Sequence, residues 1–166
     1  QLQMCIRDSA GSASDAIAVS GLSYRYDDGD APVFENLSLR VAEGEIVALM
    51  GANGAGKTTL ARLLCALDRP SAGSITVAGL PVASSKHGKR PRALTRKERA
   101  ALRRNVGYVM QHPERQLFAD TVAEDVAYGP RNQHLSELEV ATRVEEALRM
   151  LHIAVSYTHL RAHETC

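Results

Sequence analysis

Apolar and polar residues alternate along two stretches near the beginning of the chain. Residues 17–26 and 33–41 both follow the two-residue period of a strand that buries one face. The sequence Asp-Asp-Gly-Asp at residues 27–30 lies between them and is typical of a turn. A turn at residues 69–73 precedes another short strand-like run, residues 74–78. The pattern therefore predicts three strands in the first half of the chain.

Two other runs are apolar almost throughout. Residues 45–50 and 106–110 lack alternation, which indicates strands buried on both faces, as in a parallel sheet. Residues 81–94 are polar and contain Pro and Gly, so they predict an irregular insertion. The chain therefore combines half-buried strands with fully buried ones.

Helical spacing of apolar residues and cap residues predict the helices. Thr95 with Glu98, and Ser136 with Glu139, each form a capping-box pattern at the start of a predicted helix. The pair Gly129-Pro130 is expected to stop the helix that precedes it. The predicted helices are residues 59–67, 95–104, 121–128 and 136–151.

The two ends of the chain lack this patterning. Residues 1–9 and 155–166 show neither hydrophobic periodicity nor cap residues that connect them to their neighbours. Both can be read as translated sequencing adapter: residues 4–8 correspond to one strand of a transposon end, and residues 155–165 to its reverse complement and the adjoining adapter. We therefore expect both ends to be adapter-derived and residues 10–154 to be native.

Residues 51–59 read GANGAGKTT, a complete G-x-x-x-x-G-K-[ST] phosphate-binding motif. The motif follows a predicted strand and opens a predicted helix, the context that distinguishes a phosphate-binding loop from a chance match. Gly51, Gly54 and Gly56 allow backbone N–H groups to turn toward phosphate oxygens, and the helix N-terminus adds a partial positive charge. The motif predicts that the chain binds a nucleoside triphosphate.

The side chains of the motif have distinct expected roles. Lys57 is predicted to reach the β- and γ-phosphates, and the Thr58 hydroxyl to bind Mg²⁺. Asn53, Ala55 and Thr59 are expected to line the same nucleotide site. The histidines share no ligand spacing, so no metal site other than that of Mg²⁺ is expected.

Composition fits one globular domain. The chain has 166 residues, of which 45% are hydrophobic, and a net charge of +1. It contains no apolar span of membrane length and no signal peptide, so we expect it neither to cross a membrane nor to be secreted. Its three cysteines show no metal or redox spacing, which fits a reducing, cytosolic location.

Residues 86–104 hold nine Lys or Arg residues and one Glu. A nucleic-acid or anionic-membrane patch is one interpretation, and a solvated basic face is the other. No aromatic residue is interleaved to stack on bases. We therefore expect no nucleic-acid partner.

Residues 33–79 resemble the opening of the nucleotide-binding core of the ATP-binding cassette (ABC) ATPases. Tyr26 matches the aromatic residue that stacks on adenine in that family. Gln111, at the end of the second apolar run, matches the Q-loop glutamine, which offers its oxygen to Mg²⁺ and its amide to the attacking water. The resemblance implies an α/β P-loop NTPase core with an N-terminal antiparallel β-subdomain, and ATP with Mg²⁺ as cofactors.

Residues 108–132 look more specifically like the ATPases of energy-coupling factor (ECF) transporters. Those proteins carry Q-[NDF]-P-[DE]-x-Q-L-F and then T-V-x-x-D-V-A-[FY]-G-P-x-N, and here only His112 departs from the pattern. The resemblance implies the ATP-binding subunit of a vitamin or cobalt/nickel importer, peripheral at the cytoplasmic face of the cell membrane. Its partners would be a transmembrane transporter subunit and a second ABC ATPase subunit, as a homo- or heterodimer. The alternatives are the ATPase of another ABC transporter and a non-transport ABC protein.

The later motifs of that family do not occur in this sequence. They are the L-S-G-G-Q signature, the Walker B Asp-Glu, the D-loop and the switch histidine. Residues 135–138 begin like the signature but lack its glycines, so we interpret them as a helix cap. We therefore expect residues 10–154 to be the N-terminal part of an ABC ATP-binding domain, truncated before the signature, poorly soluble and inactive as an ATPase.

Overall fold

The structure is a computed structural model and describes residues 3–4, 14–27, 31–85 and 90–152. The chain forms two compact units, residues 1–108 and residues 109–166, and each is described by itself. Among the described residues, no helix is long and apolar enough to cross a membrane.

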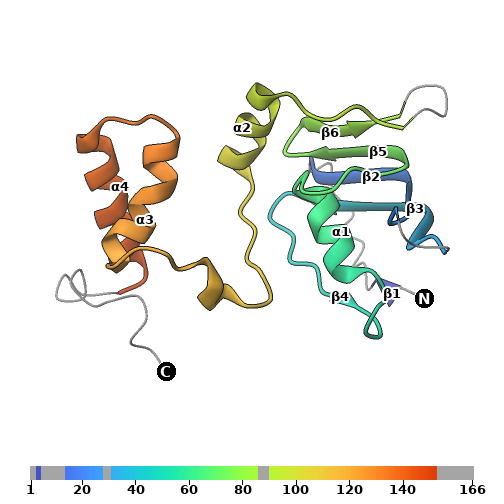
Figure 1. Cartoon of the computed structure of the whole chain (residues 1–166), viewed down its shortest axis with the longest axis horizontal. Helices are drawn as coiled ribbons and strands as arrows, with labels where there is room; N and C mark the ends of the chain where they lie inside the picture. Colours follow the sequence, from blue (N-terminus) through green and yellow to red (C-terminus); the bar gives the residue numbers. More distant parts are fainter. Residues whose placement is uncertain (1–2, 5–13, 28–30, 86–89, 153–166) are drawn as a thin grey trace. The chain divides into compact units, whose positions relative to one another are not determined.

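The first unit contains a four-stranded antiparallel sheet in the order β3-β2-β5-β6 (Figure 1). Its strands are β2 (Asp15–Tyr24), β3 (Phe34–Ala42), β5 (Ala72–Val77) and β6 (Leu80–Ser84). The three predicted strands correspond to β2, β3 and β5, and the predicted antiparallel β-subdomain is confirmed. The turn at residues 27–30 lies mostly outside the described residues.

The sequence did not predict the strand β6, because the polar residues 81–94, with their Pro and Gly, indicate an irregular insertion. The turn at Ala78 and Gly79 folds it back on β5, where Ala83 pairs with Ile75 and both are buried. Pro81 is tolerated because β6 is an edge strand of this sheet and needs fewer N–H donors. Residues 86–89 of the insertion lie outside the described part, and its residues 90–94 form no helix or strand.

One hydrophobic core joins the sheet to two helices. The helix α1 (Lys57–Leu64) contributes Leu60 and Leu63, and the helix α2 (Arg96–Asn105) contributes Leu102. These side chains pack with the inward-facing residues of the sheet, among them Leu22 and Ile75, which are fully buried. The inward-facing residues of the strands and the apolar residues of the two helices therefore pack in a single core.

The prediction of buried parallel strands at residues 45–50 and 106–110 is wrong. Only Leu49–Met50 of residues 45–50 forms a strand, β4, which pairs antiparallel with β1 (Gln3–Met4). Ile46 is 98% exposed. Residues 106–110 form no strand, and Val109 is 76% exposed.

The physical reason is that an apolar run specifies burial, whereas a strand also requires a hydrogen-bonding partner. In the described part of the chain, β4 pairs with β1 alone, and β1 lies in the end that we propose to be adapter-derived. The run at residues 106–110 crosses the boundary between the two units: Val106 packs against the core of the first unit, whereas Val109 and Met110 are exposed.

The second unit is helical over its described residues. It contains a 3₁₀ turn η1 (Pro113–Gln116) and the helices α3 (Val122–Asn132) and α4 (Glu137–Met150), which lie side by side (Figure 1). Ala127 of α3 and Val140 and Leu148 of α4 are buried.

The predicted stop of α3 at Gly129-Pro130 is also wrong, because α3 continues to Asn132. A proline normally excludes its preceding residue from helical backbone through a contact with that residue's Cβ. Gly129 has no Cβ, so Pro130 is accommodated in the last turn. The helix then ends two residues later.

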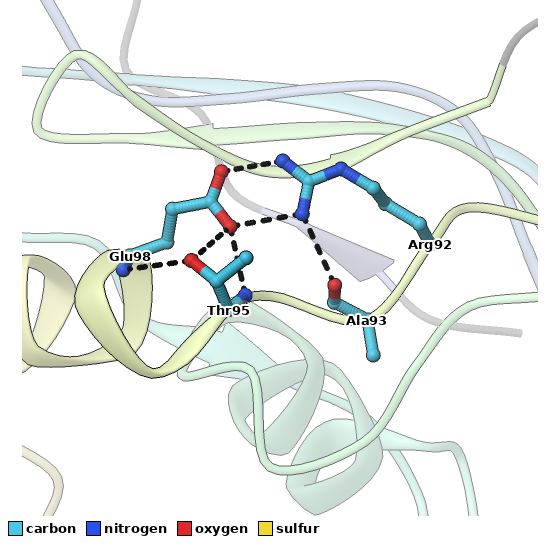
Figure 2. Close-up of polar contacts among 4 residues, drawn as sticks. All are labelled: Arg92, Ala93, Thr95 and Glu98. Carbon is cyan, nitrogen blue, oxygen red and sulfur yellow. Dashed lines mark hydrogen bonds and ion pairs between the residues drawn. The ribbon is translucent and has the colours of Figure 1, made fainter.

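Both predicted capping boxes are present. Thr95 accepts from the Glu98 N–H at 3.3 Å, and the Thr95 N–H donates to the Glu98 carboxylate at 2.8 Å (Figure 2). The Arg92 guanidinium donates two further hydrogen bonds to the same carboxylate. At the start of α4, Ser136 and Glu139 form the same reciprocal pair.

Candidate nucleotide-binding site

The phosphate-binding loop leads directly into α1. Gly56 is the residue before the helix and has a φ of 90°, in the left-handed region. A Cβ at Gly56 would lie 2.7 Å from the Phe34 and Val33 side chains, so the position requires glycine for both its backbone and its surroundings. Gly54 also has a positive φ, 82°, but faces open space. The loop is therefore held against the beginning of β3.

The N-terminus of α1 is free to bind an anion. Gly56 supplies no side-chain cap, and the first turn of α1 contains no acidic residue. The first N–H groups of a helix have no acceptor within the helix, so without a cap they remain available to phosphate oxygens. The helix dipole adds a favourable potential at the same place.

The Lys57 ammonium lies over the loop. Its Nζ donates to the carbonyl oxygens of Gly51 at 2.7 Å and Ala52 at 2.8 Å. Both acceptors are neutral carbonyls, so these contacts fix the position of the cation without cancelling its charge. A phosphate at the loop would meet this ammonium directly.

The two threonines that follow Lys57 face different surroundings. Thr58 is exposed, whereas Thr59 is 5% exposed. The exposed position of Thr58 fits the role of a Mg²⁺ ligand beside nucleotide phosphates. Among the described residues, no group of three or more acidic, His or Cys side chains could hold a metal by itself.

Tyr26 lies against the helix that carries the loop. Its hydroxyl is 2.7 Å from the Thr59 hydroxyl, and the residue as a whole is 46% exposed. The Tyr24 ring contacts it edge to face, with a centroid distance of 5.0 Å. Burial raises the pKa of Tyr24, which is part of the core. The structure thus brings the predicted base-stacking residue next to the predicted phosphate site.

The ion pair between Arg62 of α1 and Asp68 was not predicted from the sequence. Arg62 donates two hydrogen bonds to Asp68, with Nε to Oδ2 at 2.6 Å and Nη2 to Oδ1 at 3.0 Å. The hydrogen bond from Arg62 holds the pKa of Asp68 below its ordinary value. The pair joins the last turn of α1 to the turn that follows. The only signal in the sequence was a basic residue near the helix end with an acidic residue six positions on.

The remaining predicted site residues contribute less defined geometry. Asn53 is exposed and Ala55 is half-buried, with its N–H donating to the Ala52 carbonyl at 3.2 Å. Gln111 belongs to the second unit, where it is exposed just before η1. Its contact with metal or water stays a prediction.

Asp125 is a second residue that was not assigned a role from the sequence. Its Oδ1 accepts from the N–H groups of Phe118 and Ala119 at 3.3 and 3.2 Å, which joins the segment after η1 to α3. Phe118 and Tyr128 form an edge-to-face pair at 4.5 Å in the same region. These contacts give the Asp of the T-V-x-x-D sequence a structural role in this unit.

Comparison with known proteins defines the class of this chain. The sequence profile of the family described as "ABC transporter" matches residues 34–165. The chain belongs to the ABC transporter family, and the predicted family and fold are confirmed. The match extends into residues 155–166, whose adapter origin is a proposal.

Individual relatives refine this assignment. The chain is 64% identical over 140 residues to a Bifidobacterium longum protein named "Putative ABC transporter ATP-binding protein", covering 82% of this chain and 18% of that protein. It is 40% identical over 133 residues to the energy-coupling factor transporter ATP-binding protein EcfA of Methanocaldococcus jannaschii, covering 80% of this chain and 44% of that protein.

A solved structure shows the same fold. CbiO1 from Clostridium perfringens, described as part of the ABC transporter complex cbiONQ, aligns with a TM-score of 0.73 and 30% identity. The alignment covers 92% of this chain and 56% of that one. The chain therefore spans about half the length, or less, of these relatives.

Proposed function

We propose that the chain supplies the phosphate-binding part of an ATP site in an ABC transporter ATPase. The observation that carries the proposal is the uncapped N-terminus of α1, with the Lys57 ammonium held over the loop by two carbonyl oxygens. Lys57 would bind the β- and γ-phosphates, Thr58 would bind Mg²⁺, and Tyr26 would stack on adenine. Mg²⁺ would bridge phosphate oxygens and neutralise part of their charge.

Replacement of Lys57 tests this proposal. Lys57→Ala removes the only cationic side chain of the loop and should weaken Mg·ATP binding by about 1.5–3 kcal/mol, or roughly 10- to 150-fold. Isothermal titration calorimetry measures the difference. The matched control is Lys97→Ala, an exposed position in α2 with the same change of charge. Equal affinities of wild type and Lys57→Ala would contradict the assignment.

We further propose that the whole protein is an ECF-type ATPase that couples ATP hydrolysis to import of vitamins or of cobalt or nickel ions. Supporting this are the sequence of residues 108–132 and the relative named as an energy-coupling factor ATP-binding protein. It would act at the cytoplasmic face of the membrane, as a homo- or heterodimer with a second ABC ATPase subunit, on a transmembrane subunit. Gln111 would contact Mg²⁺ and the attacking water.

The genomic DNA around this coding sequence tests that finer assignment. We expect a continuation that encodes the signature and Walker B motifs, and a neighbouring gene for a transmembrane subunit. In that genomic DNA, the codons at the positions of residues 1–9 and 155–166 should be unrelated to an adapter. Tandem ABC domains with no membrane subunit nearby would favour a non-transport ABC protein instead.

A further inference from the structure

The first unit contains a cavity between the turn that follows α1 and the segment that precedes α2. Its volume is about 230 Å³, slightly below the roughly 300–1,000 Å³ of sites for drug-sized ligands. The residues that line it are 66–70, Val82 of β6, 92–94 and Arg99 of α2. None of them belongs to the phosphate-binding loop, so this cavity is separate from the candidate nucleotide site.

Two ion pairs beside this cavity have no net charge. Arg62 donates two hydrogen bonds to Asp68, at 2.6 and 3.0 Å. Arg92 donates two to Glu98 and a third to the Ala93 carbonyl at 3.2 Å (Figure 2). Both carboxylates are therefore neutralised by an arginine of the same unit, and neither arginine adds a positive charge that is left over.

Arg69 and Arg99 are different, because neither forms an ion pair with another described residue. Arg69 comes from the turn after α1 and Arg99 from α2, so the two side chains enter the cavity wall from separate elements. Both are exposed, so a ligand from solvent can reach them. The wall therefore carries two guanidinium charges that repel each other, and an anion between them would relieve this repulsion.

A second cavity, of about 500 Å³, adjoins the first along β6. Both cavities are lined by Val82, Arg92 and Leu94, and the second adds Arg90 and residues 81, 83 and 84 of the strand. Val82 is buried and Leu94 is half-buried, so they form an apolar floor that is common to the two cavities. A ligand held in the first cavity therefore has room to extend over apolar surface in the second.

We propose that the first cavity binds the phosphate group of a small phosphate monoester between Arg69 and Arg99. Such a group carries close to two negative charges near pH 7 and has three acceptor oxygens. It therefore matches two guanidinium groups, each of which presents a fork of donors to an oxyanion. A carboxylate has one charge and is already matched by one arginine, as in the two ion pairs described above.

The rest of the ester would lie in the second cavity, over Val82 and Leu94. The inference goes beyond the proposed ATP-binding function and does not rest on it, since it uses no residue of the phosphate-binding loop.

Titration with glycerol 3-phosphate, followed by NMR of the arginine Nε–H groups, tests this site. The signals of Arg69 and Arg99 should shift together and give one dissociation constant. Arg69→Met and Arg99→Met should each weaken binding about tenfold or more, the loss expected for a charged hydrogen-bonding partner. The matched control is Arg103→Met, an exposed position in the last turn of α2 that does not line the cavity. It should change the affinity by about twofold at most. Spectra without ligand check that each variant keeps the fold.

Three further titrations identify the ligand and its location. Inorganic phosphate should shift the same two signals but bind more weakly, because it leaves the second cavity empty. Acetate at equal ionic strength should bind about tenfold more weakly or less, because it has a single charge. Lys57→Ala should leave the titration with glycerol 3-phosphate unchanged.

Four results would overturn the proposal. Signals of Arg69 and Arg99 that do not move would show that the cavity takes no phosphate. Equal weakening by Arg103→Met would reduce the effect to overall surface charge. Binding of acetate or inorganic phosphate as tight as that of the ester would remove the preference for a phosphate monoester. Loss of the titration in Lys57→Ala would place the phosphate at the loop, a result that would leave the proposed ATP site intact.

Discussion

At the scale of single residues, the phosphate-binding motif was predictable because its requirements are local. The glycines of the loop, the positive charge of Lys57 and the start of α1 all lie within nine consecutive residues, 51–59. In the structure, the Lys57 ammonium lies over the loop and donates to two of its carbonyl oxygens. The contacts that hold the loop in place were not predictable in this way. Phe34 packs on Gly56, and Tyr26 binds Thr59, across separations that no periodic pattern encodes.

Gly56 gives a direct test of this packing. Gly56→Ala should destabilise the fold in two ways: a positive φ costs an alanine about 1–2 kcal/mol, and the contact with buried Phe34 adds about 1–3 kcal/mol. Urea unfolding measures the sum. The matched control is Gly79→Ala, where φ is 71° but no atom lies within 4 Å of the new Cβ, so only the first cost applies. Equal destabilisation by both variants would show that Phe34 and Val33 move aside freely.

At the scale of elements, helices were predicted better than strands. The capping boxes of α2 and α4 are formed by residues three positions apart, so their sequence signals are complete in themselves. Strands depend on partners elsewhere in the chain. The apolar run at residues 45–50 therefore did not predict its actual pairing, which is antiparallel and limited to Leu49–Met50. The strand β6 was not predicted because it forms by pairing with β5, which its own sequence does not encode.

The cap of α2 also predicts a pH dependence. Hydrogen bonds from Arg92, and then from the Thr95 backbone and hydroxyl, lower the pKa of Glu98 from its ordinary 4.5 to about 2 (Figure 2). Because the folded-state pKa is the lower one, the stabilisation is fully present above about pH 4.5 and is lost as pH falls toward 2. The stability difference between wild type and Glu98→Gln should therefore shrink over that range.

Carbon NMR of the Glu98 carboxyl checks the cause. Its titration midpoint should lie near pH 2 in the wild type. Arg92→Met should move the midpoint upward while leaving the Thr95 cap in place, since Arg92 supplies the largest effect. A wild-type midpoint at the ordinary value would contradict the hydrogen-bonded arrangement.

At the scale of the whole molecule, both units expose large apolar side chains in the described residues. Ile46 of the first unit and Leu138 of the second are 98% and 79% exposed, and Met150 is also 79% exposed. Soluble proteins commonly cover such groups through contacts with other parts or partners. This exposure fits the expectation of poor solubility for the chain alone.

Phosphoryl transfer requires an aligned water, a metal and compensating charge in one arrangement. The loop offers Lys57 and Thr58, and the sequence contains no Walker B or signature motif. Binding and hydrolysis should therefore separate in this chain, so that it binds Mg·ATP but does not cleave it.

We expect phosphate release from Mg·ATP to stay at background for this chain, as measured by a coupled phosphate assay at saturating ATP. Lys57→Ala should leave that rate unchanged while weakening ATP binding, because the lysine acts here only on binding. A wild-type turnover of about 1 s⁻¹ or more, an ordinary enzymatic rate, that Lys57→Ala abolishes would show the opposite. The residues for hydrolysis would then have to lie within the chain itself, and Gln111 would be the first to replace.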